Sequence, residues 1–250
     1  MNTRFSCVGC GKCCTDHHVP LTLGEALQWA VDGGSLIILT EAFLADGYGV
    51  PAAQLTHATR RSARVQSGDT QAHVSITFAA YNAGRCRNLD AENLCRIYER
   101  RPLVCRIYPM EINPHIPLRP DAKDCPPESW DQGPDLIVGG KLVDSELERL
   151  IEQSREADRE DISTKEAICQ RLGIRATALK GNGFVAYLPD MDAFATAVME
   201  LVDGVESAQT DNGWTFHVAG ENVIDTLQTS GAQLITGEPA GYMFIPLQAQ

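Results

Sequence analysis

The chain of 250 residues is long enough to bury a full hydrophobic core, and its length allows one or two domains. Its hydrophobic content of 44% and charged content of 22% are ordinary for a folded soluble protein. No stretch approaches the roughly 18 consecutive apolar residues of a membrane span, and residues 1–6 do not resemble a signal peptide. We therefore expect a cytoplasmic protein with reduced thiols and no membrane partner.

The net charge of −12 is unevenly distributed along the chain. Residues 58–120 form the only basic block, with ten arginines against five acidic side chains. Guanidinium groups would offset the negative charge of a thiolate-ligated centre. The alternative is a patch that binds phosphate or nucleic acid. One basic block in an acidic chain is weak evidence for that patch, so nucleic acid is not an expected partner.

Four of the nine cysteines lie within residues 7–14. Gly9 and Gly11 allow this loop to adopt positive φ angles, which lets several sulfurs point toward one place. Nine cysteines in a reducing compartment indicate metal ligation more than disulfides. The candidate metal ligands are Cys7, Cys10, Cys13, Cys14, Cys86, Cys95, Cys105 and Cys125.

The segments between the cysteines predict a few regular elements. His17 and His18 follow the first loop and are either further ligands or a polar linker. Thr22 and Glu25 have the spacing of a capping box and predict a helix that ends at residues 33–34. Residues 35–46 are a helix or a strand, because the apolar run is too short for its period to decide. Alternating residues on either side of 67–69 predict a β-hairpin that leads to Cys86.

Residues 95–109 form the second informative stretch. Pro102 favours the start of a helix, which would place Cys105 about one turn along it. Tyr98 and Tyr108 would either line the centre or pack in the core, and Glu99 would pair with neighbouring arginines. The candidate cofactor-binding residues of this stretch are Arg106, Tyr98 and Glu99.

The combination of C-x2-C-x2-C-C with C-x-I-Y-E-x-R-P-x-x-C-R-x-Y-P resembles the YkgJ-type cysteine-cluster family over residues 4–126. This resemblance implies a zinc- or iron-chelating domain. The same region is similar to part of the bacterial flagellin lysine methylases, which implies an association with a [4Fe–4S] cluster. Two arginines, Arg100 and Arg101, precede Pro102 here, so either of them could fill the family role.

Beyond Cys125 the composition changes. Residues 131–143 read as a linker rich in glycine and proline, and residues 144–250 as a small α/β extension. We expect helices at 145–160, 163–173, 191–202 and 221–230, and strands at 184–188, 214–218 and 242–245. The second of these helices is expected to start from another capping box, Ser163 to Glu166. Cys169 lies mid-helix and is expected to be a buried bystander. The predicted fold class is α+β, with an irregular cysteine-rich, metal-centred domain over residues 1–130 that contains helices and a β-hairpin.

The spacing of the cysteines bears on the kind of centre. Structural zinc is usually bound by two close cysteine pairs, and the later cysteines form no second pair. A [4Fe–4S] cluster often uses C-x2-C-x2-C with a remote cysteine followed by proline, which Cys7, Cys10 and Cys13 and the later Cys125-Pro126 match. An iron–sulfur cluster is therefore favoured over zinc, although the spacing does not decide which later cysteine closes the site. The adjacent side chains of Cys13 and Cys14 are expected to diverge, so they serve different sites or only one of them ligates.

Three functions fit this pattern. The first is a metal-loaded protein for storage, insertion or sensing. The second is an iron–sulfur enzyme of redox or methyl-transfer type, which would need a pocket beside the centre lined by the tyrosines or arginines. The third is a structural zinc module whose C-terminal region binds a partner protein.

Overall fold

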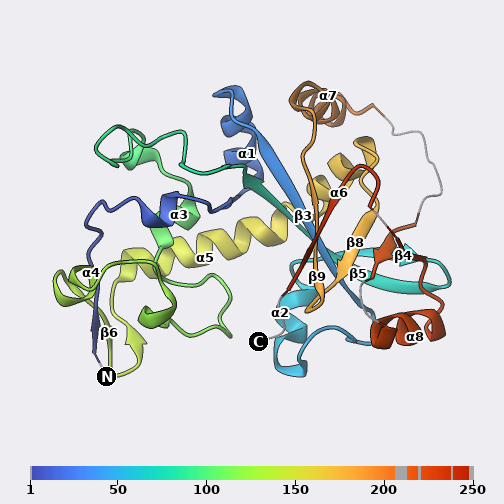
Figure 1. Cartoon of the computed structure of the whole chain (residues 1–250), viewed down its shortest axis with the longest axis horizontal. Coiled ribbons are helices and arrows are strands. Elements are labelled where there is room, and N and C mark those ends of the chain that lie inside the picture. The colour runs from blue at the N-terminus through green and yellow to red at the C-terminus, as the bar shows by residue number, and fades with distance from the viewer. Residues whose placement is uncertain (1, 206–212, 219–220, 238, 248–250) are drawn as a thin grey trace.

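The computed structural model describes residues 2–205, 213–218, 221–237 and 239–247. It contains both helices and sheets, as the α+β class predicts. Figure 1 shows two lobes, one built on a large sheet and the other on the cysteine-containing loops, helices α3 to α5 and a small sheet. Along the described ranges, no helix combines the length and apolar composition needed to cross a bilayer.

The large sheet has nine strands and the order β11-β10-β8-β3-β5-β2, with β4 on β5, and β9 between β3 and β12. Its strands are β2 (Val19–Leu21), β3 (Leu36–Leu44), β4 (Ala63–Ser67), β5 (Thr70–Ala80), β8 (Ala176–Leu179), β9 (Gly183–Tyr187), β10 (Thr215–His217), β11 (Leu234–Ile235) and β12 (Met243–Pro246). Strand β3 is central, because it pairs with β5 antiparallel along its whole length and with β8 in parallel. Seven of its nine residues are buried, which explains why the period of the apolar run did not distinguish a strand from a helix. The predicted hairpin is confirmed, with Ser67 opposite Thr70.

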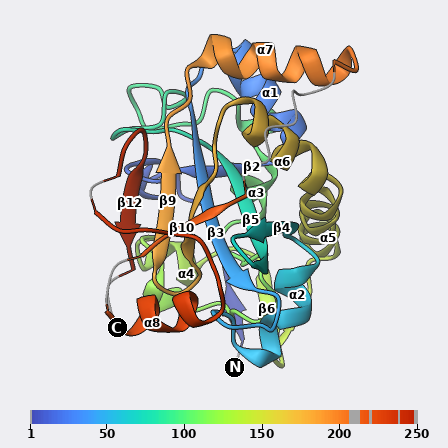
Figure 2. The ribbon, with the colours of Figure 1, turned by 90° about the vertical axis from the view of Figure 1, so that its right-hand side faces the viewer.

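Helices cover this sheet in the views of Figures 1 and 2. They are α1 (Leu23–Val31), α2 (Leu55–Thr59), α6 (Ile162–Arg171), α7 (Met191–Val202) and α8 (Glu221–Thr229). Contacts join α1 to β5 and α7, and α6 to β5 and α7. Phe78 and Phe194 meet edge to face in the core between them. Cys169 is fully buried in the same core, as predicted for a thiol used in packing.

One predicted capping box is confirmed and the other is wrong. Thr22 Oγ1 accepts a hydrogen bond from Glu25 N, and Glu25 Oε2 accepts one from Thr22 N. The second box was expected to start a helix at residue 163, but α6 begins at Ile162 and its N-cap, Asp161, makes no capping bond with its side chain. The reason is that Asp161 is both the C-cap of α5 (Ser145–Glu160) and the N-cap of α6, so no separate turn lies between the two helices.

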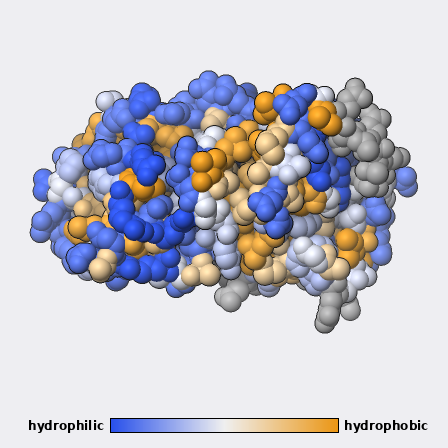
Figure 3. Space-filling view, turned by 90° about the horizontal axis from the view of Figure 1, so that it is seen from above, coloured by the Kyte–Doolittle hydropathy of each residue, from blue (hydrophilic) through white to orange (hydrophobic). Residues whose placement is uncertain are grey.

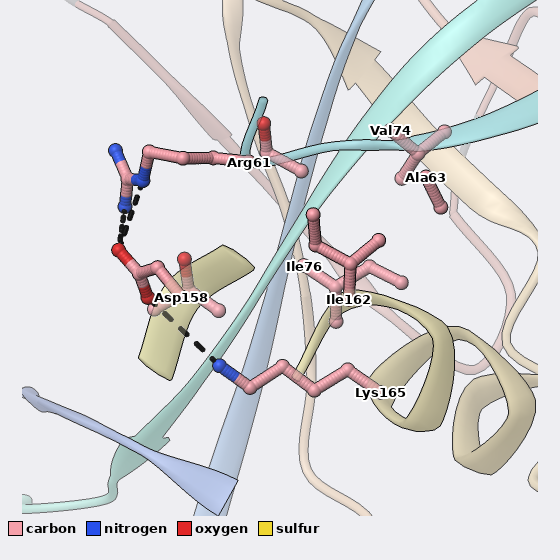
Figure 4. A pocket seen from close by; sticks show the side chains of 9 residues that line it. Arg61, Ala63, Val74, Ile76, Asp158, Ile162 and Lys165 are labelled. Atoms are coloured by element: carbon pink, nitrogen blue, oxygen red, sulfur yellow. Dashed lines mark hydrogen bonds and ion pairs between the residues drawn. The ribbon is translucent and has the colours of Figure 1, made fainter. Parts of the chain in front are cut away.

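The buried cation of Lys165 in α6 is paired with carboxylates of α5 and of the junction between the two helices, and Figure 4 shows its pair with Asp158. The side chain of Lys165 is 5% exposed and lies 3.5 Å from the carboxylate of Asp161 and 4.0 Å from that of Asp158. Arg61, directly after α2, donates to Asp158 at 2.9 Å. The hollow beside these groups has a volume of about 20 Å³, which is room for about one water molecule. We interpret this charged cluster as structural.

The second lobe contains α3 (Leu103–Ile107), α4 (Glu128–Asp131), α5 (Ser145–Glu160) and a sheet of β1 (Thr3–Arg4), β6 (Asp135–Val138) and β7 (Lys141–Leu142). Four 3-10 helices complete the described elements: η1 (Lys12–Cys14), η2 (Ala52–Gln54), η3 (Tyr98–Arg100) and η4 (Pro120–Ala122). Helix α5 has the predicted bounds and buries Leu147, Leu150 and Ile151 in the core that it shares with α3.

The segment expected to be a linker, residues 131–143, forms β6 and β7, and β6 pairs with the N-terminal β1. The large sheet takes strands from both sides of this segment, β2 to β5 before it and β8 to β12 after it. The division of the chain into separate folding domains at 1–130 and 144–250 stays a prediction.

Candidate metal centre

The N-terminal cysteine loop is folded against the turn that precedes Cys95. Gly9 and Gly11 have φ angles of 67° and 72°, as expected for a loop that needs positive φ. A Cβ at Gly9 would lie 3.1 Å from Leu94, and one at Gly11 would lie 3.1 Å from Asn93. Both glycines are therefore required by the backbone conformation and by this close approach.

Backbone hydrogen bonds join the first loop to the segment around Cys86. Cys14 O accepts from Cys86 N at 2.7 Å, and the flanking residues Thr15 and Arg85 form an isolated β-bridge. A second isolated bridge joins Leu89 to Cys95, and Arg96 N donates to Asn88 O at 2.8 Å. Residues 86–96 thus form a closed loop that holds Cys86 and Cys95 at its two ends.

Helix α3 carries Cys105 and begins directly after Pro102, one residue later than the prediction that placed Pro102 in the first turn. Its N-terminus is bound by α1, because Glu25 Oε1 accepts from Leu103 N at 2.7 Å. Figure 1 shows the blue N-terminal loop passing beside α3. The carboxylate of Glu25 therefore connects the sheet lobe to the helix that presents Cys105.

Cys125 is held by Tyr108, whose hydroxyl lies 3.2 Å from Cys125 Sγ. The ring of Tyr108 also meets the ring of Phe5 edge to face, with centroids 6.1 Å apart. His17 Nε2 lies 3.4 Å from Asp124, and His18 Nδ1 accepts from Asn82 N at 3.3 Å. Both histidines thus take part in hydrogen bonds or ion pairs beside the cysteines.

The adjacent side chains of Cys13 and Cys14 do not diverge, which corrects the expectation from the sequence. Their Sγ atoms lie 3.8 Å apart, because the 3-10 turn η1 places both on the same side of the loop. The hydrogen bond from Cys13 lowers the pKa of Cys14 to about 6, and the guanidinium of Arg101 acts in the same direction. The same bond raises the pKa of Cys13.

Burial and crowding raise the pKa of three further thiols. Burial raises the pKa of Cys105 to about 12, and the charges of Cys14, Cys86 and Cys95 act in the same direction. Burial also raises the pKa of Cys86 and of Cys125. Thiolates crowded together repel one another, so a bound cation would stabilise the deprotonated forms of these thiols.

The residues fit a thiolate-bound metal or cluster by their chemistry. Cysteine thiolates are ligands of both zinc and iron–sulfur clusters, and backbone contacts hold the loop that carries Cys14 against the segment that carries Cys86 and Cys95. Within the described ranges, no group of three or more His, Cys, Asp or Glu side chains is already spaced to hold a metal ion. The cysteines are thus gathered by the backbone without converging on one point.

A cleft of about 400 Å³ opens beside the cysteines. Its lining includes Cys7 and Cys105, the aromatic side chains of Tyr98 and Tyr108, and the arginines Arg101 and Arg106. Leu136, Leu147 and Leu150 supply apolar lining. An enzyme at this centre was expected to have a pocket lined by these tyrosines or arginines.

The structure places the three predicted cofactor-binding residues near the cysteines, with different surroundings. Tyr98 lies in the cleft wall, 50% exposed, with the guanidinium of Arg101 3.7 Å from its ring centre. Arg106 lies in the cleft and 3.6 Å from the carboxylate of Glu146. Glu99 is exposed and, within the described ranges, forms no ion pair with the neighbouring arginines.

The sequence did not predict the roles of two residues beside the cysteines, Arg101 and Glu25. Arg101, and not Arg100, is the arginine whose charge acts on Cys14 and Cys105, because Arg100 points toward Asp32 at 3.9 Å. Among the described carboxylates none forms an ion pair with Arg101, which leaves its charge available to thiolates. Glu25 was recognised only as a cap, since no local pattern signals its bond to Leu103.

The comparison with protein families agrees with this geometry. Residues 6–126 match the CxxCxxCC family model, described as "Putative zinc- or iron-chelating domain". The matched CxxCxxCC region contains all eight candidate ligands and leaves out Cys169. It supports a cysteine cluster that chelates zinc or iron, whereas the similarity to YkgJ-type proteins and flagellin lysine methylases stays a prediction. No curated protein and no solved structure matches the chain.

Proposed function

We propose that the CxxCxxCC region holds a zinc or iron centre through cysteine thiolates, and that the chain works as a metal-loaded protein for storage, insertion or sensing. The observation that carries the proposal is the gathering of eight thiols by backbone contacts between segments far apart in the sequence. Such ligands must stay reduced, so the proposal includes a cytoplasmic location. The C-x2-C-x2-C spacing and the Cys125-Pro126 pair favour a [4Fe–4S] cluster over zinc.

The chain's own residues have definite roles in this proposal. The thiols lose their protons when the metal binds, so binding releases protons into solution. Arg101 offsets the added negative charge near Cys14 and Cys105. Once Cys125 is a thiolate, the Tyr108 hydroxyl would donate a hydrogen bond to its sulfur and fix its orientation. An iron–sulfur cluster would supply one-electron redox chemistry, and a zinc ion would supply structural cross-linking.

The test compares two cysteine variants. Cys10→Ser should lower the metal content and the melting temperature together, because metal binding and folding are coupled. Cys169→Ser is the matched control, since this thiol lies in the core outside the CxxCxxCC region, and its metal content should equal that of the wild type. Full metal content in Cys10→Ser, or loss of metal in Cys169→Ser, would contradict the assignment.

The cleft favours a second candidate function, an iron–sulfur enzyme of redox or methyl-transfer type. It lies beside Cys7 and Cys105, and its lining combines aromatic and apolar side chains with charged groups of both signs, as in many ligand sites. Dithionite should bleach the visible absorption of a redox-active cluster and leave a zinc protein unchanged. Saturable binding of S-adenosylmethionine by the loaded chain, weakened in Tyr98→Ala, would support methyl transfer. The absence of both responses would exclude these two reactions.

Exposed apolar side chains support a third candidate, a module that binds a partner protein. Val31 at the end of α1 is 81% exposed, and Met199 and Val202 on α7 are 58% and 82% exposed. Figure 3 shows apolar atoms gathered over the middle of the upper face, where Figure 1 places α1 and α7. A Val202→Lys variant that keeps its metal but loses a partner in cross-linking of the full chain would favour this function.

A further inference from the structure

We propose that the eight cysteines form two four-thiolate sites side by side. The inner site consists of Cys14, Cys86, Cys95 and Cys105, and the outer site consists of Cys7, Cys10, Cys13 and Cys125. The inference rests on the proposed metal-binding function, which it extends by assigning every thiol to one of two centres.

The backbone brings the inner set together. The bond from Cys86 N to Cys14 O places these two residues in direct contact, and the bridge between Leu89 and Cys95 closes the loop that holds Cys86 and Cys95. Cys105 enters from α3, whose N-terminus is fixed by Glu25. These contacts come from segments 14, 86–95 and 103–107, and none of them involves Cys7, Cys10 or Cys125.

A different set of contacts brings the outer set together. Ser6 N donates to Ser129 O at 2.9 Å, so the chain just before Cys7 is bound to the chain just after Cys125. The ring of Tyr108 packs against Phe5 while its hydroxyl holds the sulfur of Cys125. Cys10 and Cys13 belong to the same short loop as Cys7, at the C-x2-C-x2-C spacing that suits a common centre.

The pair Cys13–Cys14 is the boundary between the two sets. Their sulfurs lie 3.8 Å apart, but Cys14 is bound through its backbone to Cys86, whereas Cys13 belongs to the C-x2-C-x2-C run with Cys7 and Cys10. With Cys125 the outer set has four thiols, so Cys105 is the fourth ligand of the inner set.

The two centres would lie close together and differ in accessibility. Sulfurs 3.8 Å apart, each about 2.3 Å from its own metal, place the metals at most about 8 Å from one another. The inner set has the charge of Arg101 beside it. The outer set includes Cys7, the one exposed cysteine among those that the structure describes, whereas the four thiols of the inner set are all partly buried. We therefore assign a closed, structural role to the inner site and an exchangeable role to the outer site.

Zinc-dependent protection of the full chain from alkylation tests the grouping without any mutation. The reduced, metal-free protein receives zero, one or two equivalents of Zn²⁺ and then iodoacetamide, and peptide mass spectrometry reports the modification of each cysteine. We expect one equivalent to protect Cys14, Cys86, Cys95 and Cys105 together, and the second to protect the other four. A chelator should then expose the outer set first. Buried Cys169 is the internal reference and should stay unmodified throughout.

The outcomes separate this inference from the function on which it rests. Protection of a set that mixes the two groups, or of all eight thiols by one equivalent, would overturn the two-site inference and leave metal binding intact. No protection at any zinc concentration would overturn both. Double variants give an independent check: Cys10→Ser/Cys125→Ser should keep about half of the wild-type zinc, whereas Cys10→Ser/Cys95→Ser should keep almost none. Equal zinc content in the two double variants would contradict the partition.

Discussion

The carboxylate of Glu25 connects the two lobes, and its removal is the most informative single perturbation. Oε2 accepts from Thr22 N at 2.9 Å and completes the capping box of α1. Oε1 accepts from Leu103 N at 2.7 Å, which is one of the backbone donors at the start of α3 that have no partner within the helix. Glu25→Ala therefore removes one bond from each of two helix N-termini.

The cost follows from these two contacts. Loss of a capping interaction costs about 0.5–2 kcal/mol, and loss of a hydrogen bond to a charged group costs about 1.5–3 kcal/mol. Because Glu25 is partly exposed, we take the lower part of the combined range, about 2–3 kcal/mol. For a chain of this size, about 2–4 °C per kcal/mol gives a fall in melting temperature of about 4–12 °C.

Thermal unfolding of the metal-loaded protein measures this effect, and metal retention during dialysis against a chelator measures its consequence for Cys105. We expect Glu25→Ala to melt lower and to lose metal faster than the wild type, with Glu25→Gln in between because it keeps an oxygen acceptor. Glu156→Ala, on the exposed face of α5, is the control and should change neither property. A melting temperature for Glu25→Ala within 1–2 °C of the wild type would refute this account of how α3 is anchored.

Three further predictions concern the surroundings of the site. Leu150 is 4% exposed and packs in the core between α5 and α3. Leu150→Ala should lower the free energy of unfolding by about 2–5 kcal/mol in denaturant titration, and an unchanged denaturation midpoint would show that this core is not closely packed. Arg106→Ala should change the free energy of unfolding by less than about 1 kcal/mol, because the ion pair of Arg106 with Glu146 is exposed. The variant should keep its metal and shift only the reduction potential. A variant purified without metal would show that Arg106 is needed for metal binding. Burial lowers the pKa of His57 to about 4, below its pKa in the unfolded chain. The free energy of unfolding should therefore fall as the pH drops from about 6.5 to 4, and this pH dependence should be weaker in His57→Gln. An equal pH dependence in both proteins would contradict the burial of a neutral imidazole.

Much of the secondary structure could be predicted because the signals were local. The charged amphipathic segment 145–160 and the segment 191–202 have the predicted bounds, since each starts at an aspartate that caps it, Asp144 or Asp190. The pairing of β6 with β1 could not be predicted, because it joins residues about 130 positions apart through short strands with no clear pattern. The start of α6 was misplaced because a capping-box spacing occurs by chance in the first turn of this helix, which follows α5 after the single residue Asp161.

The candidate site could be predicted in its composition but not in its arrangement. Spacing singled out the eight thiols as candidate ligands, since few other uses require four cysteines in eight residues, and the matched family region contains all eight. The 3.8 Å contact between Cys13 and Cys14 depends on the 3-10 turn η1, which the sequence does not signal. The choice of Arg101 over Arg100, and the bond of Glu25 to Leu103, depend on tertiary contacts between lobes that no local pattern specifies.

The central claim is that the CxxCxxCC region binds zinc or iron through its cysteines. Its most direct test is metal and acid-labile sulfide analysis of the full chain purified without oxygen, together with an absorption spectrum. We predict bound iron and sulfide in equal amounts, with a broad absorption band at about 400 nm, as is ordinary for a [4Fe–4S] cluster. Zinc without sulfide, and a featureless visible spectrum, would keep the claim and replace the cluster by structural or exchangeable zinc. A folded chain that contains neither metal, and that takes up neither after reduction and reconstitution, would contradict the account.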